Sequence, residues 1–146
     1  MAGKFKLQTV LNYRQSLEDQ AQQVLTTSLQ RQKEFEKQLI DQQQTLDEVD
    51  IELKHRQQEG MTVAEIDLYE GQIYHCQRVI EDIQQQLQRL GLQIEEERKE
   101  LLYAARQRQV LEKLKDKQEA EYRQELSRQE RVMLDEISLQ RKGKKS

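Results

Sequence analysis

The 146-residue sequence has only two histidines and one cysteine, and these residues and its many carboxylates form no recognisable catalytic or metal site. His75 and Cys76 are adjacent, so on a helix they point in different directions, and the only other histidine is His55. The glutamates at 95–97 could exchange protons with a substrate only inside a pocket that excludes water. We therefore expect no enzymatic activity, no metal ion and no cofactor.

The composition predicts long helices rather than a globular core. Only 35% of the residues are hydrophobic, another 35% are charged, and the sequence has no proline and no tryptophan. The straight-chain residues that dominate it lose little conformational freedom in a helix. Basic and acidic residues nearly balance, at 24 and 27, so we expect no general attraction to nucleic acid. No apolar run is long enough for a membrane span or a signal peptide, and a cytoplasmic protein is expected.

Apolar residues in the second half recur at alternating steps of three and four, the period of a coiled-coil seam. This predicted seam is broken only by Glu97 and consists of Ile66, Tyr69, Ile73, Cys76, Ile80, Ile83, Leu87, Leu90, Ile94, Glu97, Leu101 and Ala104. The first half shows the period less regularly, with a phase shift near residue 31 and with polar Arg14, Ser28 and Gln42 at seam positions. Its apolar seam residues are predicted to be Leu7, Val10, Leu17, Ala21 and Val24, then Phe35, Leu39, Leu46, Val49 and Leu53.

Three signals mark a turn between the two seams. Gly60 can adopt the left-handed conformation that ends a helix, and Thr62 followed by Glu65 is a capping box that starts the next one. Met61 and Ile66 have the spacing of a hydrophobic staple. The alternative is a glycine tolerated inside one continuous helix. We predict an all-α antiparallel coiled-coil hairpin, with helices over about 5–59 and about 62–139, a turn at about 60–61 and a basic flexible tail at 140–146.

The second predicted helix is the longer one, at about 115 Å against about 80 Å for the first, so its C-terminal end overhangs. The antiparallel register of a short turn places Phe5 level with about Lys115. Beyond that level, exposed apolar residues predict an interaction surface, unless a second copy covers the segment or the segment frays. These residues are Tyr122, Leu126, Val132, Met133, Leu134, Ile137 and Leu139.

Both ends of the sequence resemble the flagellar FliJ family. The matching motifs are F-x-L-x-x-V-L-x-Y-R at 5–14, V-L-E-K-L at 110–114, E-Y-R at 121–123 and E-R-x-x-L-D-E at 130–136. The resemblance implies a soluble, non-enzymatic component of the bacterial flagellar type III export machine, similar in form to the central stalk of rotary ATPases. It also implies a place at the periphery of the membrane-associated export apparatus, without insertion into the membrane.

The resemblance implies partners as well. Members of the family bind the hexameric export ATPase through the paired ends of their helices, and they contact the membrane export gate and export chaperones. Carried onto this sequence, the ATPase-facing residues are Phe5, Leu7, Leu11, Tyr13, Arg14, Leu114, Tyr122, Arg123, Leu126, Arg131, Leu134 and Asp135. Tyr69 and Tyr74 are the candidate gate-binding residues. A monomer is expected when the chain is alone, and a homodimeric coiled-coil scaffold or a chaperone for flagellar substrates are the alternatives.

Overall fold

The computed structural model describes residues 5–144, and over these residues it contains two helices and no strand. Helix α1 is Gln8–Glu59, with 52 residues, and helix α2 is Val63–Lys144, with 82. The predicted antiparallel two-helix fold with a longer second helix is confirmed. Helix α2 continues through part of the predicted tail, to Lys144. Residues 145 and 146 lie outside the described part.

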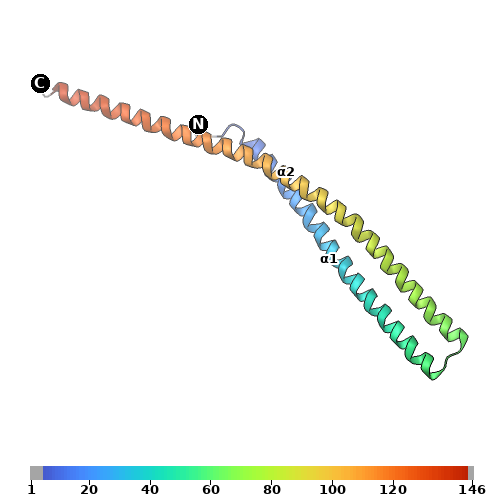
Figure 1. The fold of residues 1–146 in the computed structure, drawn as a ribbon. Coiled ribbons are helices and arrows are strands. Elements are labelled where there is room, and N and C mark those ends of the chain that lie inside the picture. Colours follow the sequence, from blue (N-terminus) through green and yellow to red (C-terminus); the bar gives the residue numbers. More distant parts are fainter. Residues whose placement is uncertain (1–4, 145–146) are drawn as a thin grey trace. The chain divides into compact units, whose positions relative to one another are not determined.

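The two helices contribute to two compact units. The terminal unit consists of the described parts of Met1–Gln20 and Leu102–Ser146, and the turn unit is Ala21–Leu101. In the turn unit, α1 and α2 lie side by side and antiparallel, and the turn between them is at one end (Figure 1). Each unit therefore combines part of α1 with part of α2.

The turn joins the helices through Gly60, Met61 and Thr62. Gly60 has a φ of +97°, which residues with a side chain rarely adopt, and its N–H donates to the Gln57 carbonyl at 3.4 Å. The Thr62 hydroxyl accepts a hydrogen bond from the backbone N–H of Glu65 at 3.2 Å and so caps the start of α2. The glycine and the capping threonine thus end one helix and begin the next, as the sequence predicts.

The seam of α2 agrees with the prediction over its whole predicted length. Every predicted seam residue from Ile66 to Ala104 is buried or half-buried. The hydrophobic core of the turn unit is centred on Leu25, Leu90 and Ile94, against which Leu29, Phe35 and Leu101 pack. The same alternation continues past the predicted end through half-buried Arg108, Leu111, Lys115, Gln118 and Tyr122.

The seam of α1 differs from the prediction. Leu7, Val10 and Val24 were expected to face α2 but are exposed, whereas Leu11 and Leu25 are buried. The buried and half-buried positions run without the predicted phase shift through Leu11, Arg14, Glu18, Ala21, Leu25, Ser28, Gln32, Phe35, Leu39, Gln42, Leu46, Val49 and Leu53. This seam includes more polar residues than the predicted one, and two of them have hydrogen-bonding partners on α2.

Candidate partner-binding surfaces

The start of α1 is packed within the terminal unit. Phe5 is 8% exposed and Leu11 is 3% exposed, so both side chains are withdrawn from solvent. The Phe5 carbonyl accepts a hydrogen bond from the Gln8 N–H at 3.1 Å, which holds the residues before the helix against its first turn. The Gln8 side chain in turn donates to Asn12 at 2.8 Å. Phe5 and Leu11 therefore pack within this unit and help to stabilise it.

An ion-pair cluster joins the two helices in the terminal unit. The Arg108 guanidinium donates to Glu18 of α1, with one bond of 3.4 Å, and contacts Glu112 of α2 at 2.7 Å. The hydrogen bond with Glu18 raises the pKa of Arg108, so the guanidinium keeps its charge. Continued from this pair, the antiparallel register brings Phe5 level with about Glu121. The predicted level, about Lys115, is wrong by more than one helical turn.

The C-terminal segment of α2, residues 123–142, is exposed at every position. Six large apolar side chains in it are between 40% and 68% exposed, namely Leu126, Val132, Met133, Leu134, Ile137 and Leu139. Charged residues are interleaved with them, and Glu125 pairs with Arg128 at 2.9 Å along the helix. Within the terminal unit, the blue start of α1 does not reach the red end of α2 (Figure 1). An apolar surface of this kind is typical of an interaction site.

Tyr69 and Tyr74, the candidate gate-binding residues, have different environments in the turn unit. The Tyr69 hydroxyl donates to Glu52 and accepts from Arg56, both at 2.9 Å, and the Arg56 guanidinium lies 5.8 Å from the ring centroid. Tyr69 therefore links α2 to α1. Tyr74 is 61% exposed, and the Arg78 guanidinium lies 6.0 Å from its ring centroid. Tyr74 is the more accessible of the two.

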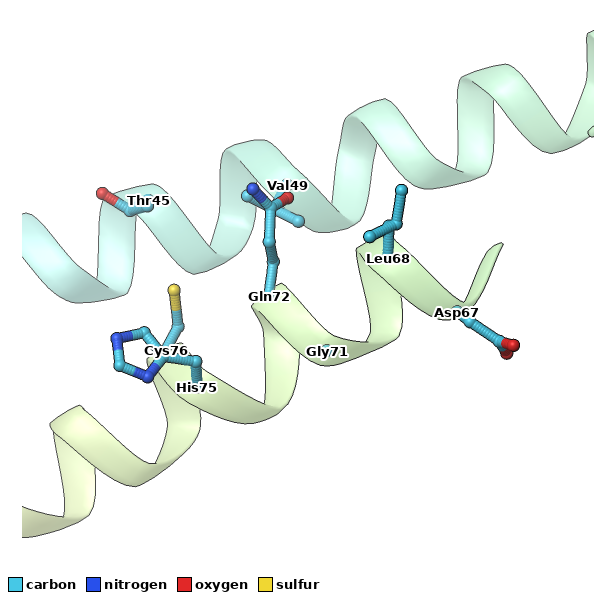
Figure 2. Close-up of a pocket in the computed structure, with 8 residues that line it drawn as sticks. All are labelled: Thr45, Val49, Asp67, Leu68, Gly71, Gln72, His75 and Cys76. Atoms are coloured by element: carbon cyan, nitrogen blue, oxygen red, sulfur yellow. The ribbon is translucent and has the colours of Figure 1, made fainter. Parts of the chain in front are cut away.

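A shallow groove of about 460 Å³ lies between the helices in the turn unit. Figure 2 shows its lining, with Thr45 and Val49 on α1 and with Asp67, Leu68, Gly71, Gln72, His75 and Cys76 on α2. The Cys76 sulfur is directed toward α1 (Figure 2). Among the described residues, no three His, Cys, Asp or Glu side chains are grouped so that they could hold a metal ion. The groove offers a contact surface rather than a set of ligands.

Comparison with known families decides the assignment. The model of the family described as Flagellar FliJ protein matches residues 3–146. The chain belongs to the FliJ family. Membership identifies it as a component of the flagellar export apparatus, in agreement with the motifs at its two ends. Searches of curated proteins and of solved structures each found no match. Neither helix, over its described length, is long and apolar enough to cross a membrane.

The structure places all of the ATPase-facing residues expected of a FliJ protein in the terminal unit. The exposed ones are Leu7, Tyr13, Leu114, Arg123, Leu126, Arg131, Leu134 and Asp135, while Arg14 and Tyr122 are half-buried and Phe5 and Leu11 are buried. Val10 and Val110 are also exposed in this unit, although neither was among the expected ATPase-facing residues. Both valines belong to the family motifs, Val10 to the one at 5–14 and Val110 to the one at 110–114, but the carried-over set omitted them, and the apolar period assigned Val10 to the seam.

Proposed function

We propose that this FliJ-family chain binds the hexameric export ATPase through its terminal unit and links it to the membrane export gate and to export chaperones. The observation that carries the proposal is the exposed apolar segment at residues 123–142. Burying one large apolar side chain is worth about 1.5–3 kcal/mol, so a few of them are enough for a specific complex. The family membership supplies the class of partner.

Such binding would act on the ATPase through asymmetry. A single helix inside a six-fold ring contacts the six subunits unequally. A ligand shifts a conformational equilibrium by the difference in its affinity for the two states, so unequal contacts favour closure of some subunits around nucleotide. The chain then contributes binding energy, and the ATPase contributes the chemistry.

The ATP hydrolysis rate of the cognate export ATPase tests this function. We expect the wild-type chain to stimulate hydrolysis and the double variant Leu126→Asp/Leu134→Asp to lose the stimulation. Losing two apolar contacts of about 1.5–3 kcal/mol each weakens binding by roughly two to four orders of magnitude. The control Gln124→Asp/Ser127→Asp adds the same charge to the same segment without removing apolar side chains. Equal activity of the two variants would contradict the proposed surface.

A truncation gives an independent measurement. A chain that ends after Tyr122 keeps every half-buried residue of the α2 seam and removes only the exposed segment. It should remain helical and fail to stimulate the ATPase. Solution mass and binding of flagellar substrates test the two alternatives, a homodimeric scaffold and a chaperone. A stable wild-type dimer that leaves the ATPase unaffected would indicate a scaffold, and binding of flagellar substrates without the ATPase would indicate a chaperone.

Substitution of one exposed tyrosine in each unit tests the proposed gate contact and the proposed ATPase contact independently. Tyr74 lies in the turn unit near the groove, and Tyr13 lies in the terminal unit; both are exposed. We expect Tyr74→Ala to weaken binding to the export gate and to leave ATPase stimulation unchanged, and Tyr13→Ala to do the reverse. If both substitutions affected both partners equally, the assignment of one partner to each unit would fail. Tyr69 is the weaker gate candidate because its hydroxyl is already bonded to both Glu52 and Arg56.

A further inference from the structure

A buried glutamate interrupts the apolar seam of the turn unit. Glu97 is 7% exposed and follows Ile94 of the core cluster. One carboxylate oxygen accepts hydrogen bonds from the Ser28 hydroxyl on α1 and from Gln93, each at 2.9 Å. The other oxygen has no hydrogen-bonding partner among the described residues. Such an arrangement costs stability compared with an apolar side chain of similar size, so its presence needs another reason.

In coiled coils, a polar residue at a seam position often determines which helices pair. The seam of α2 from Ile66 to Ile94 carries no charged residue, whereas the part of α1 that lies in the same unit places Ser28, Gln32 and Gln42 in its seam. A second copy of α2 would therefore offer this stretch a more apolar surface than α1 does. A monomeric hairpin would therefore require a feature of α2 that opposes pairing with its own copy.

The charged seam residues of α2 provide that opposition. In a parallel, in-register pair of α2 helices, each seam residue faces its own copy, so Glu97, Arg108 and Lys115 would each meet a like charge. Like charges held together cost free energy and disfavour the wrong partner. In the hairpin, by contrast, Glu97 accepts a hydrogen bond from the Ser28 hydroxyl in the turn unit, and Arg108 is paired with Glu18 in the terminal unit.

We propose that Glu97, Arg108 and Lys115 favour α1 as the partner of α2 and disfavour parallel pairing of α2 with a second copy of itself. The contacts with Ser28 and Glu18 stabilise Glu97 and Arg108 in the hairpin and would not form between two parallel copies of α2. This inference concerns the pairing of the helices and does not depend on the ATPase proposal.

Cys76 provides a built-in reporter of the excluded pairing. It is a buried seam residue of α2, and in the hairpin its sulfur is directed toward α1 (Figure 2). In a parallel α2 pair it would face Cys76 of the second copy, close enough for a disulfide. Oxidised glutathione would then link the copies: two thiols lose two protons and two electrons to form the S–S bond, and the oxidant is reduced to two molecules of glutathione.

The test compares two double variants of the full chain. Glu97→Leu/Arg108→Leu removes two of the charged seam positions, and the control Glu96→Leu/Arg106→Leu makes the same changes at neighbouring exposed positions. Each is incubated with oxidised glutathione, and the linked dimer is measured by non-reducing electrophoresis. We expect the seam variant to form at least about tenfold more linked dimer than the wild type or the control. Its solution mass under reducing conditions should also rise with concentration.

Three results would overturn the proposal. The seam variant could form no more linked dimer than the control, it could form a dimer that is not linked through Cys76, or the wild type could already be a linked dimer. If the seam variant loses its helical structure, Glu97→Gln replaces it, because this change removes the charge and keeps the size of the side chain. It should give a smaller rise in linked dimer, and no rise would count against the proposal.

Discussion

The turn offers a prediction in which one chemical change has opposite effects at two positions. Gly60→Ala and Gly71→Ala each add one methyl group, so the two variants have identical composition. Apart from the adjacent residues and the local helix backbone, no described atom would lie within 4 Å of the added Cβ at either position. Steric clash therefore contributes at neither position, and the difference between the variants reports the backbone conformation alone.

The expected free energies follow from the two conformations. Gly60 has a φ of +97°, where an alanine is disfavoured by about 1–2 kcal/mol. Gly71 is an exposed residue within α2, and alanine at such a position is favoured over glycine by about 1 kcal/mol. The two variants should therefore differ by about 2–3 kcal/mol in their free energy of unfolding, with the wild type between them.

Urea denaturation followed by far-ultraviolet circular dichroism measures this difference. Solution mass should be recorded for each variant, because the comparison holds only between monomers. Gly60→Ala should have the lower denaturation midpoint and Gly71→Ala the higher one. If Gly60→Ala were stabilised as much as Gly71→Ala, residue 60 would have to be helical in solution, and the tight turn between α1 and α2 would be refuted.

Further predictions concern the contacts that hold each unit together. Leu25→Ala removes a core side chain and should lower the free energy of unfolding by about 2–5 kcal/mol, measured by urea denaturation. Glu18→Gln removes the negative charge that pairs with Arg108 across the two helices and should lower the melting temperature in low salt, with a smaller difference in high salt because ions screen the pair. Thr62→Ala removes the cap of α2 and should cost about 1 kcal/mol in the same denaturation assay.

The seam of α2 could be predicted from the sequence because its pattern is internally consistent. Isoleucine and leucine occupy most positions from Ile66 to Leu101, and neighbouring positions are mostly polar. Glu97 interrupts the pattern, but the residues on both sides keep the period, and the structure buries it at the expected place. The buried face of α2 could therefore be predicted from the sequence of α2 alone.

The seam of α1 could not be predicted in the same way, because at two of its positions two adjacent apolar residues could each have been the seam residue. Val10 precedes Leu11 and Val24 precedes Leu25, and each pair offers two faces one residue apart. The choice of the leucines places Glu18 at a seam position, which the pattern of one helix disfavours. The seam position of Glu18 is stabilised by Arg108 on α2. The sequence of α1 alone gives no sign of that partner.

The candidate surfaces were predictable in outline. Excess length of the second helix predicted an uncovered apolar end, and residues 123–142 are exposed. The boundary was misplaced because the register depends on cross-helix pairs such as Glu18 with Arg108, so that Tyr122 is half-buried rather than fully uncovered. The bonds of Tyr69 to Glu52 and Arg56 and the groove beside Cys76 likewise depend on both helices.

The exposed segment at 123–142 extends a helix that is already formed in its paired part. An isolated peptide would first have to close a helical turn, which fixes several residues for one hydrogen bond. The paired turns of α2 up to Tyr122 remove that requirement for residues 123–142. A partner therefore meets an ordered helix and loses little of its affinity to chain ordering. Substitutions that loosen the pairing around Arg108 should consequently weaken partner binding without touching the partner.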